Sequence, residues 1–271
     1  MKDSENNNSQ HPIWWGEFTL PQHTMGRWHI GPLELWVQHL AGEWRLAWQS
    51  GEELMQPVTS VELNLPIRPL NQDMQVCRFS FRETSKPLRL LPTLADRAVV
   101  VRPEMPLFIP SGEEVTLFVS TTLWVSVYAG QHSPMLVEMP TLRPSDTWFG
   151  PNTRQGELCY ASRTLAHTQV EDVTPRPHRA ITPVQIRNHA HEPLRLERLS
   201  VPVPLLTLYQ NQVGDFWTQP VLLERSGRDG QARLQLGNAR LPDGMNARQI
   251  GVPRQLDDEV SMFRALSRFF G

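Results

Sequence analysis

The sequence is short of lysine and has no excess of basic charge. Only Lys2 and Lys86 are lysines among the 26 basic residues, and the formal net charge is -2. A surface that binds nucleic acid normally shows itself as a basic excess. The composition therefore predicts no nucleic-acid partner. The arginine bias itself fits either forked ion pairs at many sites or GC-rich coding.

Cysteine and long apolar runs are also scarce. Cys77 and Cys159 lie in apolar, strand-like contexts, which predicts buried free thiols. No apolar run approaches the roughly 18 residues that span a bilayer. Residues 1–12 are polar and lack the apolar core of a secretory signal. We therefore expect a cytoplasmic protein that does not span the membrane and keeps its cysteines reduced.

Proline is abundant instead, with 24 residues spread along the chain. Because proline removes a backbone hydrogen bond from a helix or a central strand, this distribution excludes long helices. Apolar and polar residues alternate with period two at 33–40 and 44–48, which is typical of strands. Further strand-like segments follow every 8–12 residues or so, as in a sandwich or barrel. Six of the nine tryptophans lie between positions 14 and 48, which favours a core of large side chains over a stacking platform for sugars or bases.

These patterns predict an all-β protein made of two β-sandwich-like domains, with a short C-terminal amphipathic helix. We expect a polar tail at 1–12, an N-terminal domain at 13–142, a long connecting segment at 143–180, a C-terminal domain at 181–250 and the helix at 255–270. The helix is indicated by an apolar stripe with spacings of three and four, formed by Val260, Phe263, Leu266, Phe269 and Phe270.

The most site-like stretch is 143–163, where the alternation of the preceding strands stops. Carboxylates, arginines, an amide and aromatic rings come together there, a set that suits a sugar or a small anion. The candidate ligand-binding residues are Asp146, Trp148, Asn152, Arg154, Glu157, Tyr160 and Arg163. The same residues also fit a structured inter-domain loop whose aromatic rings fill a domain boundary.

One short cluster resembles a metal site. His189 and His191, followed by Glu192, would share a face if they lay on a strand. Their position between Asn188 and Pro193 favours solvated histidines in a hairpin turn instead. We expect no bound metal and no cofactor.

No catalytic signature is found. The sequence has neither a phosphate-cradling glycine loop nor a G-x-S-x-G nucleophile motif. Paired acids such as Glu52–Glu53 fall at predicted turns, where solvation accounts for them. These features favour a function without catalysis, although they leave the question of an enzyme open.

The overall pattern of motifs resembles a prokaryotic family of unknown function, domain-of-unknown-function family 432. The segments that carry the resemblance are WWGEF, GRWHIGPLELW, EWRLAW, LADRAVVVRPE, SGEEVTLFVSTTLWV and RPSDTWFGPNTRQGELCYASRT. The similarity extends from Trp14 to about Leu236 and implies a bacterial protein with no established catalytic residues. It also implies a link to mechanosensitive channels, whose genes accompany members of the family.

Two functions follow as hypotheses. The first is a non-enzymatic interaction or assembly module that binds a protein partner, or a second copy of the chain, through residues 255–270. The alternative is a carbohydrate or small-anion binding domain with its site at 143–163.

Overall fold

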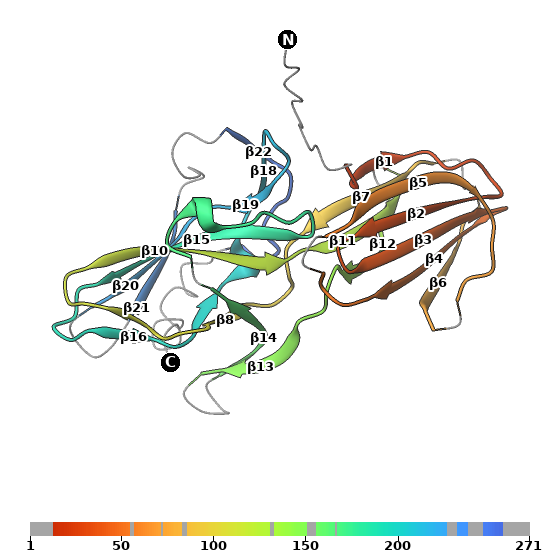
Figure 1. Cartoon of the computed structure of the whole chain (residues 1–271). Coiled ribbons are helices and arrows are strands. Elements are labelled where there is room, and N and C mark those ends of the chain that lie inside the picture. Colours follow the sequence, from red (N-terminus) through yellow and green to blue (C-terminus); the bar gives the residue numbers. More distant parts are fainter. Residues whose placement is uncertain are drawn as a thin grey trace, which may run out of the picture.

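The computed structural model describes residues 13–54, 57–71, 73–82, 86–130, 133–150, 156–165, 167–226, 232–237 and 246–256 (Figure 1). Within these ranges the regular structure is strand, apart from two short 3-10 turns, η1 at Val170–Asp172 and η2 at Val203–Leu205. The prediction of an all-β fold is thereby confirmed. In the described part of the chain no helix is long and apolar enough to cross a membrane.

The N-terminal lobe consists of two antiparallel sheets that pack against each other. One sheet has the order β5-β2-β3-β4-β6 and the other has the order β1-β7-β11-β12. Their contact includes the rings of Phe18 and Trp28, whose centroids lie 5.2 Å apart at a steep angle. The strands are β1 Gly16–Phe18, β2 Thr24–Ile30, β3 Leu33–Leu40, β4 Glu43–Ser50, β5 Thr59–Pro66, β6 Gln75–Ser80, β7 Leu88–Thr93, β11 Trp124–Ala129 and β12 Met135–Pro140.

The C-terminal lobe is built around β15, which pairs antiparallel with β10 and in parallel with β19 and β20. A second sheet has the order β13-β14-β8-β17, and β16 pairs with β9. The strands are β8 Val99–Pro103, β9 Leu107–Ile109, β10 Glu114–Thr122, β13 Ser145–Phe149, β14 Glu157–Thr164, β15 Arg179–Asn188, β16 Leu194–Leu196, β17 Leu199–Val201, β18 Leu208–Asn211, β19 Phe216–Thr218, β20 Val221–Arg225, β21 Ala232–Leu236 and β22 Ala247–Gln249.

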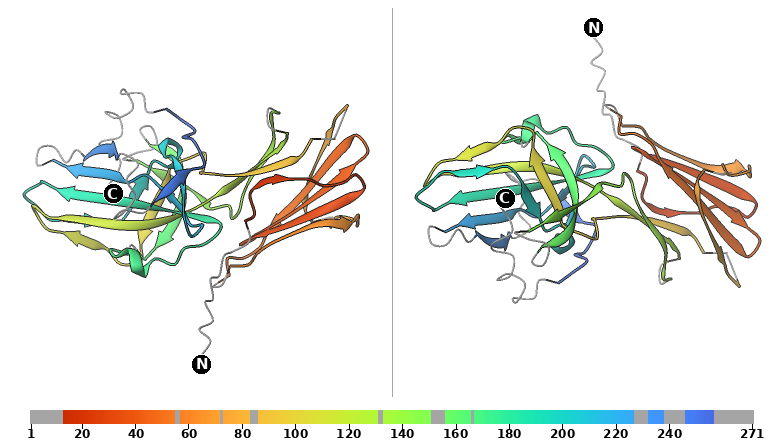
Figure 2. Two further views of the ribbon diagram at one scale, coloured as in Figure 1. Left: turned by 90° about the horizontal axis from the view of Figure 1, so that it is seen from above. Right: turned by 90° about the horizontal axis from the view of Figure 1, so that it is seen from below.

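The chain passes between the two lobes three times (Figures 1 and 2). It leaves the N-terminal lobe after β7, returns between β10 and β11, and leaves again after β12. Only Leu123 separates β10 from β11, and it is fully buried. Strands from residues 99–122 therefore pair with β14, β15 and β17, which come later in the chain. The predicted division into domains at 13–142 and 181–250 stays a prediction, and any boundary has to accommodate these pairings.

One continuous hydrophobic core runs through both lobes. Trp14, Trp28 and Trp44 are among its largest fully buried side chains, so these tryptophans serve the core, as predicted. Trp14 also meets Phe216 of the C-terminal lobe, with ring centroids 6.0 Å apart. Burial of such large aromatic surfaces is a main source of folding free energy. The two lobes therefore share their stabilising contacts.

One predicted segment differs from expectation, and another lies mostly outside the described residues. The segment 143–180, predicted as a long connection, contains the β13–β14 hairpin. Gln255 and Leu256, the first residues of the predicted helix, are irregular, and residues 257–270 lie outside the described part of the chain.

Candidate functional site

The residues of the predicted 143–163 site lie on the β13–β14 hairpin, where the alternation of strand side chains divides them between two faces. Asp146 is paired across the strands with Tyr160, so these two side chains and that of Trp148 share one face. Glu157 and Arg163 lie on the opposite face by the same alternation. The candidates Asn152 and Arg154 lie outside the described residues. The hairpin thus brings three of the seven predicted residues together.

The polar groups on the first face are engaged in contacts within the protein. Asp146 accepts a hydrogen bond from Arg97 at 3.1 Å and lies 3.6 Å from a guanidinium nitrogen of Arg143. The hydroxyl of Tyr160 donates to Asp96 at 2.9 Å, and the guanidinium of Arg97 stacks over the Tyr160 ring. Burial, together with the hydrogen bond to Asp96, raises the pKa of Tyr160. This arrangement fits the structural interpretation of the segment better than an open ligand site.

The apolar residues near the tip of the hairpin are more accessible. Trp148 and its cross-strand neighbour Leu158 are both close to half exposed. Cys159 points to the other face and is fully buried against Val100 and Phe149. Burial raises the pKa of its thiol to about 12, so the thiol is protonated at neutral pH and a poor nucleophile. Both cysteines are free, as predicted, but Cys77 is only partly buried, so the prediction of a buried thiol is wrong for that residue.

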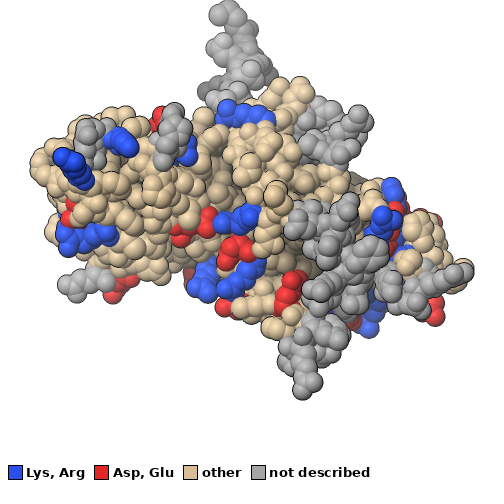
Figure 3. Space-filling model, turned by 180° about the vertical axis from the view of Figure 1, so that it is seen from behind, with Lys and Arg blue, Asp and Glu red and all other residues tan. Residues whose placement is uncertain are grey.

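The histidines of the predicted metal cluster lie in the turn between β15 and β16. His189 and His191 are exposed, and so is Glu192. No group of three or more potential metal ligands occurs among the residues that the structure describes. The surface charges on the face in Figure 3 are mixed, with acidic and basic side chains next to one another.

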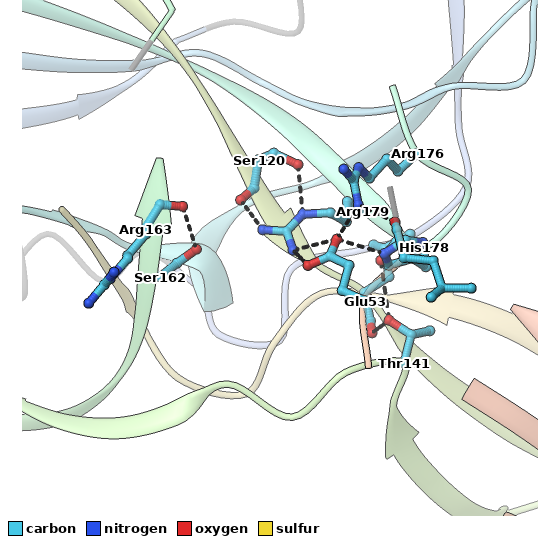
Figure 4. A network of polar contacts seen from close by, with 10 residues as sticks. Glu53, Ser120, Thr141, Ser162, Arg163, Arg176, His178 and Arg179 are labelled. Atoms are coloured by element: carbon cyan, nitrogen blue, oxygen red, sulfur yellow. Dashed lines mark hydrogen bonds and ion pairs between the residues drawn. The ribbon is translucent and has the colours of Figure 1, made fainter. Parts of the chain in front are cut away.

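A partly buried ion-pair network lies where the two lobes meet, a region we call the seam (Figure 4). Its centre is Glu53, which follows β4 in the N-terminal lobe. The carboxylate accepts hydrogen bonds from Arg176 at 2.8 Å, from His178 Nε2 at 3.1 Å and from Arg179 at 3.1 Å. These three residues come just before or at the start of β15. Arg179 also donates to Ser120 on β10, so the network joins three segments that are far apart in the sequence.

The electrostatics of this network are those of a stable structural ion pair. The hydrogen bond from His178 and the charges of Arg179 and Arg176 outweigh burial and lower the pKa of Glu53 to about 2. Burial lowers the pKa of His178, so its ring is neutral at pH 7. Because the carboxylate only accepts, the proton of the neutral ring sits on Nε2. Nδ1 then has no hydrogen-bond partner within the described residues and packs against Gly31.

Backbone groups complete the seam next to the network. The N–H of Leu123 donates to the carbonyl of His178 at 2.9 Å. The hydroxyl of Thr141 lies 2.8 Å from the carbonyl oxygen of Leu123 and 3.2 Å from that of His178. Arg163, by contrast, lies on β14 with its guanidinium directed away from Glu53 (Figure 4). Two crossings of the chain are therefore bonded to the start of β15.

A cleft of about 550 Å³ opens beside this network, between the residues that precede β1 and strands β18, β19 and β22. We call it the seam cleft, and its walls include Trp15, Arg176, Asp215, Phe216 and Arg248. Arg176 belongs both to the cleft wall and to the Glu53 network. A concave site with aromatic walls and a few charged groups is the usual form of a small-molecule site.

The sequence did not indicate this region. Glu53 was attributed to a solvated turn. It does lie in an exposed irregular segment, but its side chain is 26% exposed and bonds to three basic residues, so solvation alone does not account for it. The segment PRPHR at 175–179 carries a usable signal, since two arginines and a histidine within five residues require an acidic partner if they are buried.

Comparison with known proteins gives one match. Neither the curated proteins nor the solved structures contain a match to this chain. The family model described as "Protein of unknown function (DUF432)" matches residues 14–270. The resemblance noted in the sequence is confirmed, and the chain belongs to this family of unknown function.

Proposed function

We propose that this protein is a non-enzymatic β-sandwich assembly module, which binds a protein partner or a second copy of itself through residues 255–270. The observation that carries the proposal is the way the chain is anchored at Arg254, immediately before that segment.

Arg254 forms hydrogen bonds with both lobes. The backbone N–H groups of Arg254 and Gln255 donate to the carbonyl of Pro204 in the C-terminal lobe, at 2.9 and 3.1 Å. The guanidinium donates to the carbonyl of Leu94 and to the carboxylate of Glu138 in the N-terminal lobe, both at 2.7 Å. Residues 255–270 therefore start from a fixed point on the body of the protein.

Apolar side chains are presented at this point. Val252 is 75% exposed and Leu256 is 84% exposed, one on each side of the anchor. The apolar stripe predicted for residues 257–270 continues directly from Leu256. An amphipathic segment with such a stripe is suited to a hydrophobic groove on a partner.

The ionisable groups favour a function without catalysis. Burial alone would raise the pKa of Glu138, but hydrogen bonds from Arg254 and Ser126 outweigh it and hold the pKa below its ordinary value. The hydrogen bond from His178 and the charges of the neighbouring arginines likewise hold the pKa of Glu53 below its ordinary value. Carboxylates held ionised in ion pairs are poor candidates for a general acid.

The experiment compares assembly of the full chain with that of a chain ending at Leu256, by sedimentation over a range of concentrations. Phe263→Glu, on the predicted apolar stripe, should abolish assembly as the truncation does, whereas Ser261→Glu, on the opposite side of the predicted helix, should leave it intact. The same variants can be tested for binding to a purified mechanosensitive channel, the partner that the family resemblance implies. Unchanged assembly and unchanged channel binding after truncation would contradict the proposal.

Small-anion binding is the second candidate function. The observation that favours it is the seam cleft, whose walls contain Arg176 and Arg248. The β13–β14 hairpin is less suited to an anion, because its acid Asp146 is already paired with Arg97.

A further inference from the structure

We infer that the seam cleft is a binding site for a small organic oxyanion, in which a carboxylate or phosphate group is attached to an apolar body. This inference rests on the second candidate function, small-anion binding at the same cleft, and is independent of assembly through residues 255–270.

The first argument is an imbalance of charge at one wall of the cleft. Glu53 is the only carboxylate in the described part of the chain that pairs with Arg176 or with Arg179. Two guanidinium groups thus share one carboxylate, while His178 is neutral because burial lowers its pKa. The Arg179 side chain is 12% exposed and enclosed, whereas Arg176 lines the cleft. The surplus positive charge at Arg176 therefore favours an anionic ligand in the cleft.

The second argument is the position of Arg248 on the wall formed by β22. Its guanidinium lies over the ring of Trp15, 5.0 Å from the ring centroid. It also donates to the side chain of Gln210 at 3.3 Å, and it forms no ion pair with any residue that the structure describes. A guanidinium has five N–H donors. Stacking on Trp15 holds this group in place while leaving donors for an oxyanion, which it can bind in a forked geometry.

Among the residues that the structure describes, one acidic group lies in the wall of the cleft with these cations. Asp215 lines the cleft, and its carboxylate accepts a hydrogen bond from the amide of Asn211 at 3.0 Å. In the described part of the chain, the cleft wall and its bonded network therefore hold three guanidiniums, those of Arg176, Arg179 and Arg248, against two carboxylates. The balance favours an anion and makes Asp215 a residue that weakens its binding.

The third argument is the apolar part of the lining. Trp15 and Phe216 contribute aromatic surface, and Val213 stands 69% exposed beside them. A volume of about 550 Å³ lies within the usual range for small-molecule sites. Inorganic phosphate alone would leave this apolar surface in water. The combination fits an anion with an apolar body.

Three probes of the same shape test the inference on the full chain by isothermal titration calorimetry. These are 2-naphthoate, 2-naphthyl phosphate and the neutral 2-naphthalenemethanol. We expect at least one of the two anions to bind at one site per chain, about tenfold or more tighter than the alcohol, and to weaken as salt is added. The preference between the two anions distinguishes a carboxylate from a phosphate ligand. Equal binding of the alcohol and both anions, or no binding of either anion, would overturn the inference.

Variants locate the site. Arg248→Gln should weaken the preferred anion about tenfold, whereas Asp215→Asn should tighten it about two- to threefold. Arg195→Gln is the matched control, because Arg195 also stacks on an aromatic ring, that of Phe108, outside the cleft lining. It should bind as the wild type does. Opposite effects of the first two variants cannot come from loosened packing, which would weaken binding in both. Anion binding that is the same in Arg248→Gln and Arg195→Gln would refute the site.

Discussion

Replacing Glu53 by glutamine is expected to lower the free energy of unfolding by about 3 kcal/mol at pH 7. The fold lowers the pKa of Glu53 from 4.5 to about 2. A fall of about 2.5 in pKa corresponds to at most about 3.5 kcal/mol, because each unit is worth about 1.4 kcal/mol, and solvent screening at this partly exposed carboxylate reduces the figure to about 3 kcal/mol. The structure gives a similar magnitude by another route. Removing one partner of a buried ion pair costs about 3–5 kcal/mol, and the partly exposed carboxylate places Glu53 at the lower end.

The effect has a defined dependence on pH. Because the pKa of Glu53 is lower in the folded than in the unfolded state, its contribution is fully present above about pH 4.5. It is lost as the pH falls from there towards about 2, where the folded protein also takes up the proton. The difference between wild type and Glu53→Gln should therefore be largest at neutral pH, less than half as large at pH 3, and near zero at pH 2.

Urea unfolding followed by tryptophan fluorescence measures this difference at each pH. Glu52→Gln is the matched control, because this substitution removes the same charge at the adjacent exposed position. It should change stability by less than about 0.5 kcal/mol. A cost below about 0.5 kcal/mol for Glu53→Gln at pH 7 would refute the reasoning. So would a cost that stays constant between pH 7 and pH 3.

Two further predictions concern the packing of the seam and the thiols. Gly31→Ala should destabilise the protein by about 2–4 kcal/mol in urea unfolding, because Gly31 has a φ of +56° and a Cβ there would lie 2.2 Å from Nδ1 of buried His178. Gly51→Ala, whose added Cβ would meet only ordinary contacts, should be near neutral, and equal costs for the two variants would contradict the packing. In thiol titration with Ellman's reagent at pH 8, Cys77 should react in the native protein while Cys159 reacts only on unfolding, because burial raises the pKa of the Cys159 thiol to about 12. Equal rates for the two thiols in the native protein would be inconsistent with that burial.

Local patterning predicted much of the strand content. The alternation at 33–40 predicts β3 with the bounds that the structure has, because one side of that strand faces the core and the other does not. The strand β13 at Ser145–Phe149 was missed, since an exposed edge strand with polar residues on it lacks that contrast. Which side of the β13–β14 hairpin each residue occupies depends on cross-strand register, which polarity alone did not reveal.

The seam network was beyond sequence reasoning for a different reason. Glu53 and His178 are separated by 125 positions, and nothing local to either residue identifies the other. Their pairing depends on how the chain returns between lobes. The seam cleft likewise combines Trp15 with Arg248, from opposite ends of the chain. Such sites arise from topology, so composition and spacing along the chain do not report them.

The repeated passage of the chain between the lobes also governs the order in which the protein can fold during synthesis. The sheet β1-β7-β11-β12 of the N-terminal lobe is incomplete until residue 140 has been made, because β12 is its last strand. By then β8 and β10 have been made, but their partners β14 and β15 have not. Exposed strand edges of this kind are prone to pairing with other chains. An unfinished chain in which β8 and β10 are exposed before β14 and β15 have emerged is therefore at risk of aggregation, and fragments cut within residues 94–178 have the same unpaired edges.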